Sequence, residues 1–293
     1  MQPAVLVVGA GSVGSALSRA LRDAGMPVAL VSGRDLAAAG VHLARAGPRR
    51  LLVLAVPDRA VESVAADLAG PVAAVLAGPV TSAGAPPPGT PWAVVHCSGA
   101  LGLDVLDPLA ALGCSTGCWH PLQAFPTPST AVERGITWAV TATEPLAGTL
   151  AELTGLVGGI PLRLAESDKV RYHAAAALAA NYTVTLAAHA TALLGDCGLA
   201  PEAGLRAVLP LLRTTLAGLD RVGLPDGLTG PLARGDLGTV TRHLDVLAAY
   251  PDTLALYRAA GRATLTLLAR RGMPADDVER ARALLAEPAV TEG

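Results

Sequence analysis

The sequence of 293 residues contains a single lysine, Lys169, and a single asparagine, Asn181. Every other basic side chain apart from the histidines is an arginine, and phenylalanine occurs once, at Phe125. Alanine, glycine, proline and arginine dominate instead, which is typical of a GC-rich coding sequence. Because such a bias removes residue types that no function requires, Lys169 and Asn181 are candidates for a required role.

Charge is also scarce. Charged residues make up 16% of the chain, and the formal net charge is −2. The sequence has no basic run and no stripe of basic and aromatic residues of the kind that nucleic-acid-binding proteins carry. We therefore expect no nucleic acid partner.

Cysteine occurs only four times, which is too sparse for a disulfide framework. Cys114, Cys118 and His120 form a C-x3-C-x-H pattern, but this spacing is not typical of a zinc site. We expect buried thiols and no bound metal.

A secretory signal is not evident, because the apolar N-terminal segment lacks a positive region and runs directly into a glycine motif. Residues 174–194 are apolar enough to resemble a membrane span, but they include Asn181, His189 and three threonines, which are costly in lipid. We expect a buried central helix, no membrane partner and a cytoplasmic protein.

Hydrophobic residues make up 52% of the chain, enough for one large domain or two ordinary ones. In the first half, strand-like segments alternate with helix-like ones, which predicts βαβ units and a parallel sheet. Strands are expected at 4–8, 28–31, 51–56, 72–77, 92–97, 114–119, 137–141 and 161–164, and helices at 12–24, 35–46 and 59–68.

Helical periodicity fills nearly everything after residue 165. The expected helices are 168–194, 201–222, 237–250, 253–271 and 275–285. The sequence therefore predicts an α/β domain over residues 1–164 and an all-α domain over residues 165–293.

A G-x-G-x-x-G motif, formed by Gly9, Gly11 and Gly14, follows the first predicted strand and opens the first predicted helix. In this context the motif is typical of a Rossmann-type dinucleotide site. Gly9 permits the tight turn, Gly11 lets the backbone approach a pyrophosphate, and Gly14 allows close packing of helix and strand. The residues predicted to contact the cofactor here are Gly9, Ala10, Gly11, Ser12, Val13 and Gly14.

The end of the second strand selects the cofactor. An NAD site usually has Asp or Glu there, whereas this sequence has Ser32 and, two residues on, Arg34. A hydroxyl and a guanidinium suit a 2′-phosphate, so we predict NADP. Asp35 competes for this role but is better placed to start the next helix. After the third strand, the backbone of Ala55, Val56 and Pro57 is expected to line the nicotinamide side, and Asp58 to cap a helix.

Six segments together resemble a family of bacterial Rossmann-like oxidoreductases. They are GAGSVGSAL (residues 9–17), VLAVPDRAV (53–61), HCSGALG (96–102), HPLQAF (120–125), KVRYHAAAALAANY (169–182) and LTGPLARGD (228–236). The second domain of that family is similar to the C-terminal helical domain of the 6-phosphogluconate dehydrogenase superfamily. Ketopantoate reductase, pyrroline-5-carboxylate reductase, β-hydroxyacid dehydrogenases and prephenate dehydrogenase are wider relatives.

This resemblance implies that Lys169 matches the catalytic lysine that ketopantoate reductase and β-hydroxyacid dehydrogenases carry on the first long helix of their second domain. Those enzymes place an asparagine one turn later, where this chain has His173, while Asn181 comes further along. Lys169 can donate a proton to a carbonyl and stabilise the oxyanion, and His173, on the same helix face, can orient the lysine or act as the acid itself. The amide of Asn181 can bind substrate or cofactor.

Ser98 and His120 follow neighbouring predicted strands and are expected to face the same cleft, in a pattern that resembles prephenate dehydrogenases. A Ser98–His120 hydrogen bond would bind a substrate hydroxyl or carbonyl. A hydrolytic triad is the rival interpretation, but Ser98 does not lie in a G-x-S-x-G elbow. Gln123 and Phe125 are candidates for shaping the substrate pocket, with core packing the alternative for Phe125.

Arg234 lies in a predicted loop of the second domain and is the candidate anchor for a substrate carboxylate, with fixing of the loop as the alternative. Asp236 is expected to cap the following helix. The resemblance also implies a homodimer that forms through the helical domain.

The sequence thus predicts an NADP-dependent reductase of a carbonyl or imine in a small carboxylate-bearing substrate, with ketopantoate-reductase-like activity as the specific hypothesis. The alternatives are an oxidation like that of prephenate dehydrogenase and a non-catalytic NADP-binding sensor.

Overall fold

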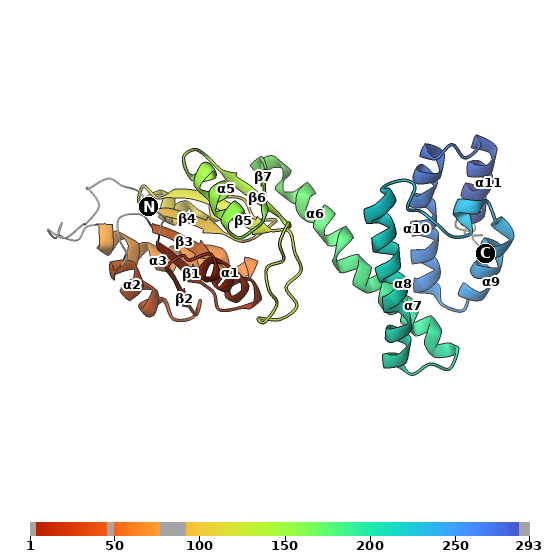
Figure 1. Cartoon of the computed structure of the whole chain (residues 1–293), viewed down its shortest axis with the longest axis horizontal. Helices are drawn as coiled ribbons and strands as arrows, with labels where there is room; N and C mark the ends of the chain where they lie inside the picture. Colours follow the sequence, from red (N-terminus) through yellow and green to blue (C-terminus); the bar gives the residue numbers. More distant parts are fainter. Residues whose placement is uncertain (1–3, 46–49, 77–91, 287–293) are drawn as a thin grey trace, which may run out of the picture. The chain divides into compact units, whose positions relative to one another are not determined.

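The computed structural model describes residues 4–45, 50–76 and 92–286. The chain forms two compact units, Met1–Asn181 and Tyr182–Gly293 (Figure 1). The first unit therefore contains the whole predicted α/β domain together with the beginning of the long helical region.

One seven-stranded sheet organises the first unit. Its strands are β1 Ala4–Val8, β2 Val28–Val31, β3 Arg50–Leu54, β4 Ala93–His96, β5 Ser115–Pro121, β6 Thr137–Ala142 and β7 Ile160–Arg163. The strand order is β2-β1-β3-β4-β5-β6-β7, and the first five strands are mutually parallel, whereas β6 runs antiparallel to β5 and β7 parallel to β6. The carboxyl ends of the five parallel strands consequently meet at one edge of the sheet.

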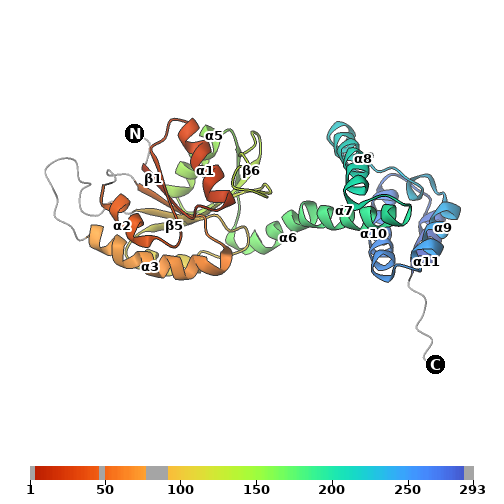
Figure 2. The same cartoon turned by 90° about the horizontal axis from the view of Figure 1, so that it is seen from below.

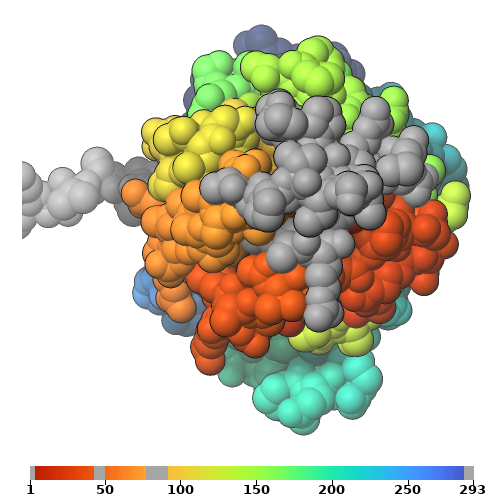
Figure 3. All heavy atoms as spheres, turned by 90° about the vertical axis from the view of Figure 1, so that its left-hand side faces the viewer, coloured from red at the N-terminus to blue at the C-terminus, as the bar shows by residue number. Residues whose placement is uncertain are grey.

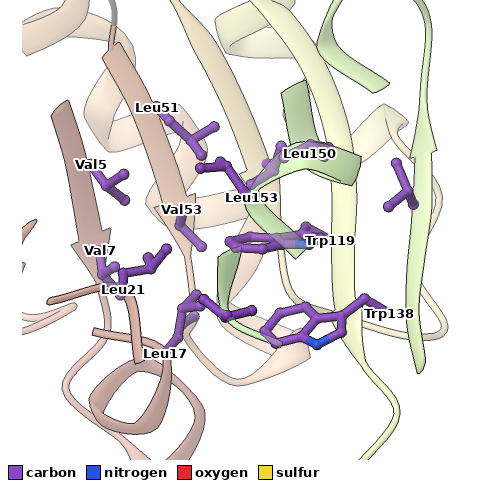
Figure 4. Packing of buried hydrophobic residues seen from close by; sticks show 14 of the residues in the cluster. Val5, Val7, Leu17, Leu21, Leu51, Val53, Trp119, Trp138, Leu150 and Leu153 are labelled. Atoms are coloured by element: carbon purple, nitrogen blue, oxygen red, sulfur yellow. The ribbon is translucent and has the colours of Figure 1, made fainter. Parts of the chain in front are cut away.

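Helices cover both faces of this sheet (Figure 2). The core on one face forms against α1 (Ser12–Asp23) and α5 (Leu146–Leu156), and Trp119 and Trp138 stack there with ring centroids 4.6 Å apart (Figure 4). The core on the other face forms against α2 (Leu36–Arg45), α3 (Asp58–Leu76) and the short α4 (Asp107–Ala110), which follows the 3-10 turn η1 (Asp104–Leu106). In the surface view of Figure 3, α2 and α3 form adjoining patches of the first unit.

The strand expected at residues 72–77 is wrong for all of its described residues, because α3 continues to Leu76. Its valines and alanines match strand preferences locally. However, Val61, Val64, Leu68 and Val72 recur at helical spacing and are all buried against the sheet. Packing of this continuous helical stripe outweighs the local preference for a strand.

The long helix expected at 168–194 is divided in the structure. After the 3-10 turn η2 (Glu166–Asp168), α6 spans Lys169–Ala179 and α7 spans Asn181–Asp196, with a break at Ala180. The prediction that this region is buried is wrong for the single chain, since only 6% of its most apolar window is buried. Residues 166–196 are long and apolar enough to cross a membrane by length and composition alone.

The regular structure of the second unit is helical throughout its described residues. It contains α7, α8 (Pro201–Val222), the 3-10 turn η3 (Leu232–Arg234), α9 (Leu237–Leu247), α10 (Pro251–Arg270) and α11 (Ala275–Leu285). Its core forms between α9, α10 and α11 around Val240, Leu265 and Leu285. Asp236 accepts the backbone N–H of Thr239 at 3.0 Å, so the predicted cap of α9 is present. The predicted fold class, a Rossmann-type α/β domain followed by helices, is confirmed.

Candidate active site

The turn between β1 and α1 has the backbone that its three glycines predict. Gly9 has a φ of +122°, and a Cβ there would lie 2.3 Å from the carbonyl oxygen of Ala55. A Cβ on Gly14 would lie 1.8 Å from the carbonyl oxygen of Gly9. By contrast, a Cβ on Gly11 would meet nothing within 4 Å. Packing therefore requires Gly9 and Gly14, whereas Gly11 leaves open space beside the backbone.

Helix α1 begins at Ser12 without a side-chain cap, so no side chain competes for its first amide groups. The N-terminus of a helix carries partial positive charge and free N–H groups that suit a phosphate. The open space at Gly11 and this helix end together fit the pyrophosphate of a dinucleotide. Ala10 is exposed and Val13 is partly buried in the same turn.

The turn after β2 lies next to the turn after β3, because a Cβ on Gly33 would lie 2.6 Å from Cγ1 of Val56. Ser32 and Arg34 are both exposed there. Asp35 instead accepts the N–H of Ala38 at 3.0 Å and caps α2, which is the role that its position predicts. The Ser32 hydroxyl accepts the backbone N–H of Arg34 at 3.2 Å. Both residues lie in the turn where a Rossmann-type fold holds the adenosine ribose.

The segment after β3 continues along the same edge. The backbone N–H of Ala55 donates to Val8 at 2.8 Å, and exposure then increases from buried Ala55 to exposed Pro57. Asp58 begins α3, and its carboxylate also accepts the hydroxyl of Ser98 at 2.9 Å. Asp58 thus joins the turn after β3 to the loop after β4, a contact that the cap prediction did not include.

Ser98 organises the loop after β4. Its Oγ donates to Asp58 and accepts the backbone N–H groups of Ala100 at 3.2 Å and Leu101 at 3.1 Å. Among the described contacts, the hydroxyl bonds Asp58 and not His120, so the geometry does not provide the Ser–His pair of a hydrolytic triad. The side chain is also 6% exposed and acts here as a loop brace.

His96, at the end of β4, is hydrogen bonded to the same loop at two points. Its Nδ1 accepts the N–H of Ser98 at 3.1 Å, which leaves Nε2 to donate to the carbonyl oxygen of Gly102 at 3.1 Å. Burial, together with the nearby Lys169 charge, lowers the pKa of His96 to about 4. The ring is therefore neutral at pH 7, in the tautomer that this network requires.

Lys169 is buried, with 1% of its surface exposed. Its Nζ donates to the carbonyl oxygen of Ser98 at 3.1 Å and contacts Sγ of Cys118 at 2.9 Å. The thiol of Cys118 also donates to the Ser98 carbonyl oxygen, at 3.1 Å. The amine thus lies beneath the Ser98 loop and is enclosed by it.

His120 and His173 converge at the outer side of this loop. A Cβ on Gly99 would lie 2.9 Å from Nε2 of His120 and 2.9 Å from Nδ1 of His173. Nδ1 of His120 is hydrogen bonded to the hydroxyl of Tyr172 at 2.9 Å. His173 is exposed, in contrast to Lys169 on the same helix. Two imidazole nitrogens therefore flank Gly99, one from the partly buried His120 and one from the exposed His173.

Burial lowers the pKa of His120 to about 4, and the charges of Lys169 and His173 add to this effect. Burial also raises the pKa of Tyr172, so its phenol keeps its proton at neutral pH. A neutral His120 whose Nδ1 accepts the Tyr172 proton carries its own proton on Nε2. In that state Nε2 is a hydrogen-bond donor that lies beside Gly99.

Two simple periodicities bring these groups together. Cys118 and His120 are two residues apart on β5 and therefore share one face of the sheet. Lys169, Tyr172 and His173 have the i, i+3, i+4 spacing of one helix face. The face of α6 thus lies on the end of β5, at the same sheet edge as the glycine turn.

Sequence reasoning missed three members of this cluster: Cys118, Tyr172 and His96. The alternation on β5 and the helical spacing on α6 were available signals for the first two. His96 had none, because a buried histidine in an apolar strand resembles ordinary core until its loop contacts are known.

Other predicted residues lie elsewhere. Asn181 begins α7 and is exposed, whereas Lys169 begins α6, on the other side of the break at Ala180. Arg234 is exposed in the second unit and lines a hollow of about 320 Å³ with Arg271 and Asp277.

The two pocket candidates after β5 have different surroundings. Gln123 donates from Nε2 to the carbonyl oxygen of Ala131 at 2.7 Å and accepts the N–H of Glu133 at 3.0 Å, so it braces its own loop. Phe125 is partly buried in that loop. Within residues 4–45, 50–76 and 92–286, no group of three or more metal-ligating side chains occurs.

Comparison with known proteins supports the same architecture. Residues 136–264, from the start of β6 into α10, match the family described as Domain of unknown function (DUF2520). No curated protein shows significant sequence similarity to the chain.

Solved structures similar to this one cover nearly the whole chain. A Bacteroides fragilis protein with the provisional description NADP oxidoreductase is 22% identical, with a TM-score of 0.64 over 90% of this chain and 98% of that one. A Thermotoga maritima protein is 19% identical, with a TM-score of 0.66 over 92% and 100% of the two chains. Plasmodium falciparum pyrroline carboxylate reductase, solved with NADP bound, is 13% identical, with a TM-score of 0.55 over 97% and 98%. These similarities establish a shared fold.

Proposed function

We propose that this protein is an NADP-dependent oxidoreductase that reduces a carbonyl or imine in a small carboxylate-bearing substrate. The observation that carries the proposal is that the glycine turn and the histidine pair lie at the same edge of the sheet. The glycine turn with open space at Gly11 follows the carboxyl end of β1. Gly99, which the two histidines flank, follows the carboxyl end of β4. Open α/β sheets bind their ligands at this edge. The provisional description of the Bacteroides fragilis protein and the NADP bound to the Plasmodium falciparum reductase support the cofactor class.

The residues present fit a nicotinamide dinucleotide. The backbone at Gly11 and Ser12 would hold the pyrophosphate, Ser32 and Arg34 a ribose 2′-phosphate, and Val56 and Pro57 the nicotinamide side. When bound, the cofactor supplies the hydride. The chain itself must then supply a proton donor and an anchor for the substrate.

We assign proton donation to the histidine pair, with exposed His173 as the donor and His120 as its hydrogen-bonding partner toward the substrate oxygen or nitrogen. A candidate acid must reach the proton acceptor, and this assignment places the acceptor beside Gly99, where both imidazole nitrogens lie. Lys169 acts as a positioning residue in this proposal, because its Nζ is enclosed and holds the carbonyl oxygen of Ser98. Direct donation by Lys169 would require the amine to leave both of its partners.

The reaction is tested by following NADPH absorbance with a panel of 2-keto acids and cyclic imines, ketopantoate included. We expect His173→Gln to lower kcat at least tenfold on the accepted substrate, and to leave the Kd for NADPH within about twofold. His189→Gln, on α7, is the matched control. Equal turnover by wild type and His173→Gln would exclude His173 as the donor, and NADPH binding without turnover of any compound would favour the sensor hypothesis.

Cofactor choice is tested by titrating NADPH and NADH separately. We expect tighter NADPH binding, and we expect Arg34→Gln to remove most of the difference, because the guanidinium is the 2′-phosphate partner in this proposal. Arg19→Gln, on α1, is a control outside the turn. Tighter binding of NADH by the wild type would overturn the NADP assignment.

A further inference from the structure

Cys118 has no part in the proposed reaction, yet its sulfur lies 2.9 Å from Nζ of Lys169. Both side chains are buried, Cys118 completely and Lys169 with 1% exposed. The other described partner of the sulfur is the carbonyl oxygen of Ser98, at 3.1 Å. The only lysine of the chain is thus held against a thiol inside the protein.

This arrangement restricts what an oxidised Cys118 can react with. A sulfenic acid condenses with a nearby thiol or with a nitrogen nucleophile. Cys97 packs with the α1 and α5 core, and burial followed by the nearby Cys118 raises its pKa, so Cys97 is the competing thiol. The Lys169 amine is the nucleophile already in contact. Burial raises the pKa of the Cys118 thiol, and the Lys169 charge and hydrogen bond offset part of this rise.

We propose that Cys118 and Lys169 form an oxidative modification site, at which hydrogen peroxide produces a covalent Sγ–Nζ bond. In the first step, sulfur attacks one peroxide oxygen, the O–O bond breaks, and the departing oxygen leaves as water with the thiol proton. In the second step, the neutral amine attacks sulfur, the S–O bond breaks, and the hydroxyl leaves as water with a proton from Nζ. Sulfur loses two electrons, peroxide is reduced to two waters, and the chain loses two hydrogens.

The bond would tie the first residue of α6 to β5 beneath the Ser98 loop. It would also remove the Nζ hydrogen bond that holds the Ser98 carbonyl oxygen. Because both groups are buried, reaction requires local opening of this loop and is expected to be slow. A thiol reductant would restore the original pair by attack on sulfur.

The single lysine makes the test direct. A lysine-specific protease can cut the unfolded chain only after Lys169, into residues 1–169 and 170–293. The full-length protein is treated with hydrogen peroxide, unfolded, alkylated without reductant and digested. We expect the untreated chain to give two fragments, and the treated chain to resist cutting, to take one alkyl group fewer and to lose about 2 Da before alkylation. Added dithiothreitol should restore cutting.

Two variants serve as controls. Cys118→Ala should remain fully cleavable after peroxide treatment, whereas Cys197→Ala, which lacks the exposed cysteine, should become resistant like the wild type. Peptide mapping of the wild type by mass spectrometry should join the Cys118 and Lys169 peptides, which decides the question even if Cys118→Ala fails to fold.

The proposal is overturned if peroxide leaves the wild type cleavable, or if Cys118 gains oxygens while Lys169 remains free. It is overturned equally if the bridge contains an extra oxygen atom, since the direct bond does not. These readouts use mass and cleavage only, so their outcome is independent of any enzymatic activity.

Discussion

At the scale of single residues, Lys169 shows why a rare side chain is retained. Its long, slender stem reaches into a space that holds two acceptors, the Ser98 carbonyl oxygen and the Cys118 sulfur. An arginine carries five N–H donors on a rigid planar group and cannot satisfy them with those two partners. This is a physical reason for lysine to be retained at this buried position despite the coding bias toward arginine.

We predict that Lys169→Arg lowers the free energy of unfolding by about 2 kcal/mol, because buried N–H donors are left without acceptors. Urea unfolding followed by circular dichroism measures the change. Arg171→Lys is the matched control, since the Arg171 side chain is 83% exposed in its surface pair with Asp168. A Lys169→Arg protein as stable as the wild type would contradict this account of the site.

His96 gives a second residue-scale prediction. Its folded pKa of about 4 is below the ordinary value of 6.5, so between these pH values the unfolded state binds the proton more readily. Stability should be full above pH 6.5 and should fall as the pH drops toward 4, with His96 accounting for roughly 3 kcal/mol of the loss.

The urea midpoint measured from pH 7.5 to pH 4 checks this dependence. His96→Gln should flatten it, because glutamine can accept from Ser98 and donate to Gly102 without titrating. His120 has the same low pKa, so part of the slope should remain. Replacement of the exposed His42 by glutamine is the control, and an equal loss of slope in both variants would refute the assignment.

At the scale of elements, the turns and helix faces at the sheet edge decide the chemistry. The glycines of the turn from β1 to α1 have different roles. Gly9 and Gly14 allow close packing, whereas Gly11 leaves open space. The face of α6 that carries Lys169, Tyr172 and His173 meets the face of β5 that carries Cys118 and His120. Neither element contains a site alone.

We predict that alanine at one glycine of that turn weakens cofactor binding, whereas alanine at another weakens the fold. Gly11→Ala should leave the melting temperature unchanged and raise the Kd for NADPH about tenfold or more, since the methyl group would fill only the space proposed for the pyrophosphate.

Gly14→Ala should destabilise the fold, because its Cβ would meet the backbone of Gly9 at 1.8 Å. Calorimetry supplies both the melting temperatures and the binding constants. Unchanged NADPH affinity in Gly11→Ala would remove the turn from the cofactor site.

Much of the element pattern was predictable. The helices at 201–222 and 275–285 match α8 and α11, because clear periodicity coincides there with proline and glycine boundaries. The error at 72–77 shows the limit of local sequence patterns. A short run of valine and alanine is compatible with a strand or a helix. The helix forms because the apolar stripe from Val61 to Val72 packs on the sheet.

At the scale of the whole molecule, the second unit has an extensive apolar surface. On α7 and α8, several large hydrophobic side chains are exposed, including Val184 at 70%, Leu211 at 67% and Leu216 at 60%. A surface of this kind usually marks an interface. We propose that a second copy of the chain covers it, in keeping with the homodimer expected from the sequence. A lipid environment suits α7 less well, because its threonines, His189 and Asn181 are costly in a bilayer.

We predict that Val184→Asp converts a dimer into monomers, with the mass from light scattering falling by half. A buried unpaired carboxylate at an interface opposes association strongly. Val41→Asp introduces the same charge at an exposed position on α2, 51% exposed, and should leave the mass unchanged. A monomeric wild type at micromolar concentration would reject the dimer.

The sequence by itself determined the fold class, the glycine turn and the selection of Lys169, Ser98, His120 and His173 as candidates. These features are local or periodic, so glycine spacing, strand alternation and helical repeats report them directly. The roles within the site depended on tertiary structure. In the folded chain Lys169 is buried, whereas His173 is exposed to solvent. The Ser98 hydroxyl donates its hydrogen bond to Asp58. Solvent access and the choice among hydrogen-bond partners arise only when distant segments meet, which is why one helix face contains both a buried amine and an exposed imidazole.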